Sequence, residues 1–174
     1  FNGKEYIETL RDDREIYIYG ERVKDVTTHP AFRNSVQSIA MLYDALHADS
    51  TKDILTCKTD TGSEGYTHRF FRYASNSKEL FLQRDAMAEW AKMTYGWMGR
   101  TPDYKASFTN TLGANPDFYG KFSGNAKHWY KRTQEAVPFI NHALVNPPID
   151  RDKIADDVKD VYISIDKETD AGIY

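Results

Sequence analysis

One short stretch of the chain combines side chains suited to holding an anionic oxygen. Arg100 and Tyr104 lie four residues apart in the stretch YGWMGRTPDY, where two glycines interrupt a helical pattern. A second helical pattern follows Pro102; if this proline opens the helix, Arg100 precedes the N-terminus and Tyr104 lies in the first turn. A guanidinium, a phenol and the free N–H groups of a helix start suit a phenolate or a carboxylate. The alternative is a helix–loop–helix corner with a solvated arginine, the commoner situation for charged loop residues.

The second candidate for chemistry is His142, which lies in the apolar run Phe139–Val145. A half-buried histidine titrates near neutrality and can donate a hydrogen bond or a proton to a phenolic oxygen. The consecutive prolines that follow, Pro147 and Pro148, make the next stretch extended and stiff. A histidine in an apolar run is more often a core residue, so both interpretations stay open. The other histidines, including His68 at a loop-side position, lack metal-binding spacing, and no metal site is expected.

Composition excludes several classes of function. The chain has 174 residues, of which 40% are hydrophobic and 28% charged, as in ordinary soluble globular proteins. The net charge is −3, and positive and negative residues are interspersed, so the sequence shows no basic patch of the kind that binds nucleic acid. The single cysteine, Cys57, excludes a disulfide framework or a cysteine-rich cluster within the chain. Apolar runs are too short to span a bilayer, and we expect a cytoplasmic protein without membrane contact. No GxSxG, P-loop or GxGxxG motif supports a hydrolase, NTPase or Rossmann fold.

The elements that must position the candidate residues are predicted to be mostly helices, joined by short loops. One of them has an especially broad apolar surface, because Leu80, Met87, Ala91, Tyr95 and Met98 share a face beside Trp90 and Trp97; we expect it to be buried between other helices. The expected helices cover 3–10 (capped by Asn2), 28–47, 76–98 (a capping box of Asn76 and Glu79), 102–112 and 117–137; a hairpin covers 15–23, a polar loop 59–65, an extended stretch 66–73, and strands 158–166 and 172–174.

The pattern changes from helical to alternating near residue 155. This change predicts a helical domain over 1–155 and the beginning of a β-domain over 156–174. The chain starts at Phe1 rather than methionine and stops within an apparent strand, so we expect it to be part of a longer protein.

Four long strings carry a resemblance to a known family. They are Arg14–Asn34, Tyr95–Lys105, Asn141–Arg151 and Val158–Ile173. In order, and over essentially the whole chain, they resemble the N-terminal part of the two-component, FAD-dependent phenol monooxygenases of the 4-hydroxyphenylacetate 3-monooxygenase family. The resemblance implies the N-terminal helical domain of an acyl-CoA-dehydrogenase-like flavoprotein. In the family this domain is followed by a middle β-domain and a C-terminal helical domain, and the whole protein is a homotetramer.

The resemblance also implies a reaction. A separate NAD(P)H-dependent flavin reductase supplies reduced FAD by diffusion, and O2 then provides the oxygen atom that is placed ortho to the hydroxyl of 4-hydroxyphenylacetate, giving a catechol. A chlorophenol monooxygenase of the same family is the alternative, as is an inactive helical assembly fragment when the chain is isolated. The family's iron–sulfur dehydratase branch is disfavoured, because Cys57 is the only cysteine.

Residues with roles in the family carry over onto matching positions. Arg100, Tyr104 and His142 correspond to the catalytic trio around the phenolic oxygen. The guanidinium favours the phenolate. The tyrosine donates or accepts a hydrogen bond in the same network, and the histidine donates a hydrogen bond or moves a proton. The expected FAD neighbours follow the histidine: Asn146, Pro148, Ile149, Asp150 and Arg151.

Overall fold

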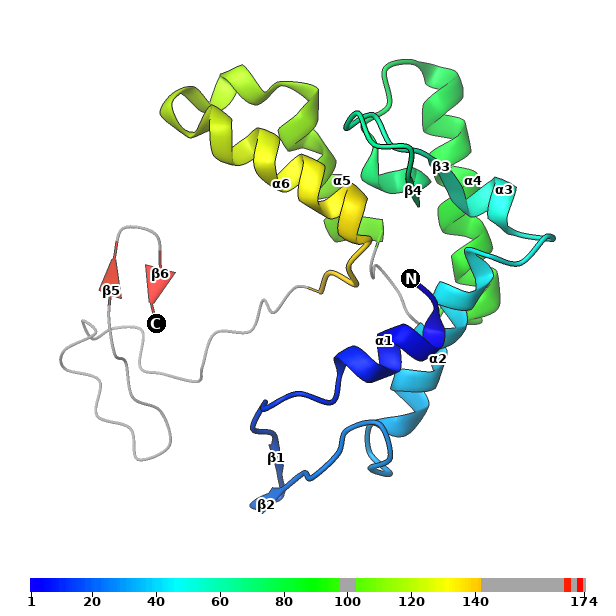
Figure 1. The fold of residues 1–174 in the computed structure, drawn as a ribbon, viewed down its shortest axis with the longest axis vertical. Helices are drawn as coiled ribbons and strands as arrows, with labels where there is room; N and C mark the ends of the chain where they lie inside the picture. Colours follow the sequence, from blue (N-terminus) through cyan, green and yellow to red (C-terminus); the bar gives the residue numbers. More distant parts are fainter. Residues whose placement is uncertain (98–102, 142–167, 170–171, 174) are drawn as a thin grey trace. The chain divides into compact units, whose positions relative to one another are not determined.

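The chain forms two compact units, Phe1–Asn141 and His142–Tyr174, each described here by itself (Figure 1). The computed structural model describes residues 1–97, 103–141, 168–169 and 172–173, with the backbone alone described at 103–104 and beyond 141. The predicted domain boundary at residue 155 therefore stays a prediction. No helix within the described residues has the length and apolar character needed to cross a bilayer.

The first unit is mainly helical, as the sequence predicts. Its helices are α1 (Gly3–Thr9), α2 (Arg33–Ala45), α3 (Lys52–Leu55), α4 (Ser77–Met93), α5 (Asp103–Ala114) and α6 (Ser123–Ala136), with 3-10 segments η1 (Arg69–Phe71) and η2 (Pro116–Phe122). Two antiparallel hairpins join β1 (Tyr17–Ile18) to β2 (Glu21–Arg22) and β3 (Thr56–Lys58) to β4 (Tyr66–His68). In the second unit, β5 (Glu168–Thr169) pairs with β6 (Gly172–Ile173), which is the returning strand expected there.

Local capping signals set the starts of two helices. Asn2 caps α1 in a complete capping box with Glu5. At α4 the Asn76 side chain accepts a hydrogen bond from the Glu79 N–H at 3.0 Å. The Glu79 carboxylate accepts from the N–H of Ser75 at 2.7 Å rather than from Asn76. The predicted box is therefore half correct, since its second bond is made one residue earlier.

Two helices begin later than predicted. The turn before α2 is held by the Asp25 carboxylate, which accepts from the Thr27 N–H at 2.7 Å, and the helix starts only at Arg33. Before α6, Gly120 has φ 51° and ψ −119°, a conformation that interrupts any continuous helix from Asp117. The segment 116–122 is accordingly a 3-10 turn, and α6 starts at Ser123.

A single core cluster joins the helices of the first unit. Its largest fully buried side chains come from α2, from α3 and from the segment that follows β4. Trp90 of α4, Ala106 of α5 and Val137 after α6 extend it, so all of these helices share one apolar interior. The largest central members are Leu42, Tyr43, Leu55, Phe70 and Phe71.

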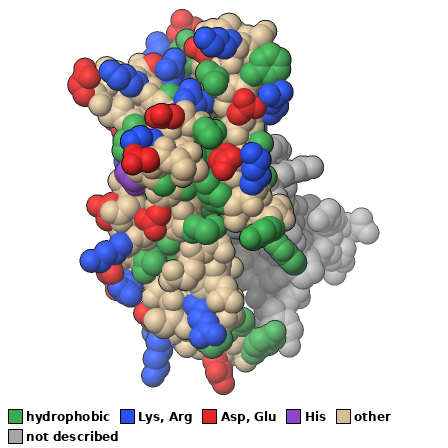
Figure 2. All heavy atoms as spheres, turned by 90° about the vertical axis from the view of Figure 1, so that its right-hand side faces the viewer, with side chains coloured by type: hydrophobic (Ala, Val, Ile, Leu, Met, Phe, Trp, Pro, Cys, Tyr) green, Lys and Arg blue, Asp and Glu red, His purple; other side chains and the backbone are tan. Residues whose placement is uncertain are grey.

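The apolar face predicted for α4 is mostly exposed. Leu80 is 57% exposed, and Tyr95, just beyond the helix, is 91% exposed. The buried face instead carries Gln83, Ala86 and Trp90. Gln83 is drawn inward because its amide donates a hydrogen bond to a backbone carbonyl in the preceding loop. The prediction of a helix enclosed by others was wrong, and Figure 2 shows a face of the molecule on which apolar side chains lie exposed among charged ones.

Candidate functional site

The structure gives the position of one predicted site residue. Tyr104 is the second residue of α5, so it lies in the first turn of a helix that begins directly after Pro102, as expected. Arg100 and His142 lie outside the described residues, and so do the five predicted flavin neighbours, Asn146, Pro148, Ile149, Asp150 and Arg151. The assignment of these residues to a site stays a prediction.

The chain approaches the corner through a fixed turn at the end of α4. Tyr95 and Gly96 both have left-handed backbone conformations, with φ 52° and φ 76°. The Tyr95 N–H donates to the Lys92 carbonyl at 3.2 Å, and the Gly96 N–H donates to the Ala91 carbonyl at 2.9 Å. This is the Schellman pattern that commonly closes a helix. The predicted interruption in this stretch is present, but α4 ends at Met93, five residues before the predicted end at residue 98, and the Trp97 side chain is 90% exposed.

Helices α5 and α6 pack against each other and run antiparallel, because the short η2 segment joins them (Figure 1). Gly113 of α5 lies against the ring of Tyr130 of α6. Seven residues before Gly113 is Ala106, and seven residues after Tyr130 is Val137; both are buried in the same cluster. The start of α5 is therefore at the end of the pair where α6 finishes.

Consequently, the first turn of α5, which contains Tyr104, lies at the end of the helix pair where α6 finishes. His142, the other predicted part of the site, follows Asn141 in the sequence and lies outside the described residues. The sequence predicts both helices, but not this register.

The end of α6 is held by a contact from a distant helix. Val137 adopts the left-handed conformation, with φ 46° and ψ 50°. Its carbonyl accepts a hydrogen bond from the buried Tyr43 hydroxyl of α2 at 2.9 Å. Pro138 then prevents the helix from continuing, as predicted. No local signal in the sequence points to the Tyr43 contact.

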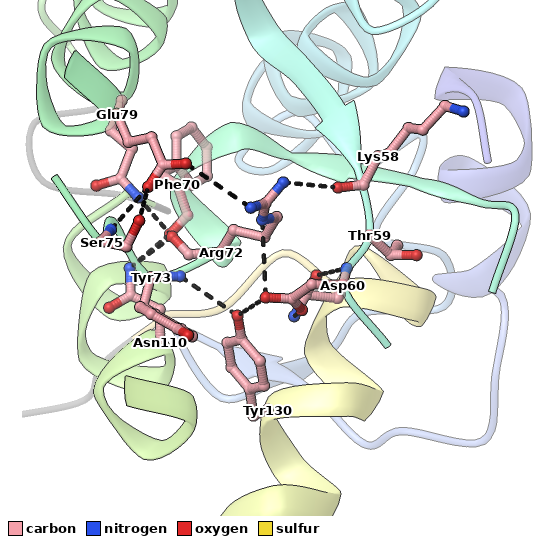
Figure 3. A network of polar contacts seen from close by, with 12 residues as sticks. Lys58, Thr59, Asp60, Phe70, Arg72, Tyr73, Ser75, Glu79, Asn110 and Tyr130 are labelled. Atoms are coloured by element: carbon pink, nitrogen blue, oxygen red, sulfur yellow. Dashed lines mark hydrogen bonds and ion pairs between the residues drawn. The ribbon is translucent and has the colours of Figure 1, made fainter. Parts of the chain in front are cut away.

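A polar network fixes the far side of the α5–α6 pair (Figure 3). The Tyr130 hydroxyl donates to the Asp60 carboxylate at 2.7 Å, and the Gln134 amide donates to the same carboxylate at 2.7 Å. Burial, together with the neighbouring Asp60, raises the pKa of the Tyr130 phenol, which stays protonated as a donor. The predicted polar loop after β3 is thus anchored on α6 by its first acidic residue.

Arg72 closes this network on the side of α4. Its guanidinium is 3.7 Å from Asp60 and 3.9 Å from Glu79, and it donates to the Lys58 carbonyl at 3.4 Å (Figure 3). Beside it lies a small pocket of about 100 Å³ that also contains Cys57. Burial raises the pKa of the Cys57 thiol. A protonated thiol beside paired charges indicates a structural role for Cys57 and Arg72 rather than a reactive centre.

One buried histidine was missed by the sequence reasoning. His68 is fully buried, with its ring 4.6 Å from the centroid of Phe70 and 4.5 Å from that of Trp90. Burial lowers its pKa to about 3, so the ring is neutral. The prediction of a loop-side position was wrong, because β4 carries this residue directly into the core. Among the described residues, no three side chains are arranged to hold a metal ion.

Comparisons with known proteins identify close relatives. The family described as "4-hydroxyphenylacetate 3-hydroxylase N terminal" matches residues 2–174. The 4-hydroxyphenylacetate 3-monooxygenase oxygenase component of Pseudomonas aeruginosa is 67% identical over 99% of this chain and 33% of its own length. The oxygenase component of a Rhodococcus 4-nitrophenol 2-monooxygenase is 57% identical over 98% of this chain and 33% of its own length.

A solved structure matches the fold as well. The oxygenase component of a 4-hydroxyphenylacetate 3-monooxygenase, complexed with FAD and 4-hydroxyphenylacetate, superimposes with a TM-score of 0.81 at 31% identity, over 99% of this chain and 36% of that one. The expected N-terminal helical domain is thereby confirmed. The chain spans about a third of the length of these relatives.

Proposed function

Because this chain belongs to the 4-hydroxyphenylacetate 3-hydroxylase N-terminal family, we propose that it is the N-terminal part of the oxygenase component of a two-component flavin monooxygenase. The proposed reaction is hydroxylation of 4-hydroxyphenylacetate ortho to its phenolic oxygen. Three relatives named for this substrate are 62–67% identical to the chain, and two others with the same name are 36% and 32% identical; the 4-nitrophenol relative is 57% identical. The three high identities favour 4-hydroxyphenylacetate over other phenols, including chlorophenols.

The cofactor in this proposal is reduced FAD, which a separate NAD(P)H-dependent reductase supplies and which activates O2. The chain's own contribution is to hold and orient the phenol. Arg100 favours the phenolate, whose ortho carbon is more electron-rich than that of the neutral phenol. Tyr104 donates or accepts a hydrogen bond in the network around the phenolic oxygen. A hydrogen bond to a charged oxygen is worth roughly 1.5–3 kcal/mol, so each group should affect the rate measurably.

His142 donates a hydrogen bond to the reacting oxygen or transfers a proton there. The stretch after it, with Asn146, Pro148, Ile149, Asp150 and Arg151, is proposed to contact the flavin. Two adjacent prolines make this stretch stiff, which suits the exclusion of water from an oxidising site. The residues are carried over from the family strings, and their roles rest on that correspondence.

The observation that best supports the site is the arrangement of α5 and α6. Helix α5 starts at Asp103, so Tyr104 stands among the free N–H groups of a helix start, where an anionic oxygen is favoured. The antiparallel partner ends beside this helix start, and the chain then continues to His142. The proposed phenol-binding corner takes groups from both segments, Tyr104 from the start of α5 and His142 from the segment that follows α6 in the sequence.

The remaining assignments concern the whole protein. We propose that residues 156–174 begin the middle β-domain, with the β5–β6 hairpin as its first described element. The full-length protein is proposed to be a cytoplasmic homotetramer that meets its reductase only through diffusing reduced FAD. The isolated chain is proposed to be an inactive helical module.

A chimera tests this proposal. Residues 1–174 replace the matching third of the Pseudomonas aeruginosa relative, and the product is supplied with reductase, NADH, FAD and 4-hydroxyphenylacetate. The chimera is expected to form the catechol, and the isolated chain to form none. A folded chimera that consumes O2 but releases all of it as hydrogen peroxide contradicts the proposal. Parallel assays with 4-nitrophenol and a chlorophenol decide the substrate.

A further inference from the structure

Two side-chain amides, one on α4 and one on α5, donate to backbone carbonyls of the short segment that follows β4. The Gln83 amide of α4 donates to the Arg72 carbonyl. The Asn110 amide of α5 donates to the same carbonyl at 3.4 Å and to the Phe70 carbonyl at 3.1 Å (Figure 3). A single carbonyl therefore joins the helix that precedes the predicted corner to the helix that follows it.

The carbonyls of this segment can accept these bonds because its helical turn ends at once. The segment η1 covers only Arg69–Phe71, and Arg72 has an extended backbone with φ −86° and ψ 139°. A continuing 3-10 helix would direct the Tyr73 N–H at the Phe70 carbonyl. This N–H donates instead to the Tyr130 hydroxyl at 3.4 Å. The side-chain amides supply the partners that these carbonyls would otherwise lack.

The hydrogen bonds of the two amides are directional, unlike the apolar contacts of the same helices. Asn110 donates to two carbonyls, so its amide nitrogen must face them and its oxygen must point away. Gln83 is 8% exposed, and its donor meets a single carbonyl. Both helices pack on η1. The amides therefore fix the rotation and the height of α4 and α5 on one common support.

Both ends of the predicted corner depend on these two helices. Gln83 lies ten residues before the end of α4, or about 15 Å along its axis, and Asn110 lies seven residues after the start of α5, or about 10 Å. A tilt of about 6° at Asn110 would move the start of α5, where Tyr104 stands, by about 1 Å. A misplacement of about 1 Å at a reacting group can cost roughly 100-fold in rate.

We propose that Gln83 and Asn110 are positioning residues for the predicted phenol corner: by donating to the Arg72 carbonyl they set the spacing of α4 and α5, and with it the place of the Tyr104 backbone. The inference rests on the proposed function, in which the stretch with Arg100 and Tyr104 binds the phenolic oxygen. Neither amide touches substrate or flavin in this scheme, since both act through the helices that carry them.

The test compares Asn110→Leu and Gln83→Met with Asn125→Leu in the chimera. The first two substitutions remove the donors and keep a similar volume; Asn125 is an exposed residue of α6 and serves as the matched control. One readout is the ratio of catechol to hydrogen peroxide formed per NADH. The other is the ultraviolet difference spectrum of bound 4-hydroxyphenylacetate, which reports the fraction present as phenolate. Both are measured where circular dichroism shows the variants folded.

We expect the ratio to fall about tenfold in Asn110→Leu and in Gln83→Met, with kcat altered more than KM and less phenolate bound. The control should change neither readout. A loss of stability alone would leave both readouts unchanged in the folded protein, so the experiment separates positioning from a purely structural role.

Asn110→Asp keeps the proposal testable if Asn110→Leu does not fold. It has nearly the shape of asparagine, but its carboxylate cannot donate to either carbonyl, and the same fall is expected. Unchanged readouts in a folded variant of Asn110 overturn the positioning role, as does an equal fall in Asn125→Leu. A parent chimera that forms no catechol overturns the proposed function instead, so the two failures are distinguishable.

Discussion

The ring of Tyr130 lies so close to Gly113 that a Cβ atom built there would come within 2.5 Å of three ring carbons. This contact lets α5 and α6 approach closely at the end away from the candidate site. The Tyr130 hydroxyl is at the same time bonded to Asp60, so the ring cannot turn aside without breaking that bond. Gly113 and Tyr130 thus set the register in which α5, which carries Tyr104, packs against α6.

Gly113→Ala should therefore destabilise the first unit. The added methyl group forces the helices apart or displaces a bonded tyrosine, and such overpacking typically costs about 1–3 kcal/mol. Urea unfolding monitored by circular dichroism measures the loss. Gly124→Ala is the matched control, because Gly124 lies in α6 with open space around it, and alanine there should stabilise by up to about 1 kcal/mol. Equal effects of the two substitutions would refute the close contact.

Tyr95→Gly is expected to stabilise the end of α4. The tyrosine has φ 52° with its side chain almost fully exposed, so it carries the cost of a left-handed conformation without gaining burial. Glycine removes a cost of about 1 kcal/mol or more, partly offset by its greater freedom when unfolded. The midpoint of urea unfolding should rise. Gly96→Ala at φ 76° should lower it, and a loss of stability in Tyr95→Gly would contradict the strained cap.

His68 predicts a dependence of stability on pH. Its pKa is lowered to about 3 in the folded chain, against an ordinary value near 6.5 when unfolded. Below pH 6.5 the unfolded chain binds the additional proton, so stability is present above that pH and is lost as pH falls toward 3. Between pH 7 and pH 5 the loss from this residue should be about 2 kcal/mol.

Urea unfolding of the parent chain and of His68→Phe at both pH values measures this effect. Phenylalanine keeps an aromatic ring between Phe70 and Trp90 but cannot bind a proton. The variant should lose most of the decrease in stability between pH 7 and pH 5. An identical decrease in parent and variant would show that His68 is not the group responsible.

Local signals predicted the local features of this fold well. Asn2 and Asn76 begin helices as expected, and Pro138 follows the end of another; α4 ends at Met93, ahead of Gly96 and earlier than predicted. The failures arise where tertiary contacts override local pattern. Gln83 turns inward because its amide donates to the Arg72 carbonyl, and the apolar stripe of α4 faces outward instead.

The residues of the candidate site were harder to predict from the sequence by physical reasoning than the fold was. Arg100 and Tyr104 have suitable chemistry at suitable spacing, but a solvated corner has the same residues. Only the family strings link that corner to His142. The Tyr43 contact with Val137 spans 94 residues and has no local signature at all.

The central claim is that Arg100 and Tyr104 hold the phenolic oxygen, and product partitioning in the chimera tests it most directly. Arg100→Ala and Tyr104→Phe are each expected to lower the catechol formed per NADH by roughly 10- to 100-fold, the equivalent of one lost hydrogen bond to a charged oxygen. The consumed O2 should appear as hydrogen peroxide instead. Tyr17→Phe, in the β1–β2 hairpin, is the matched control and should leave the partitioning unchanged. Catechol yields in both corner variants equal to that of the control would contradict the claim.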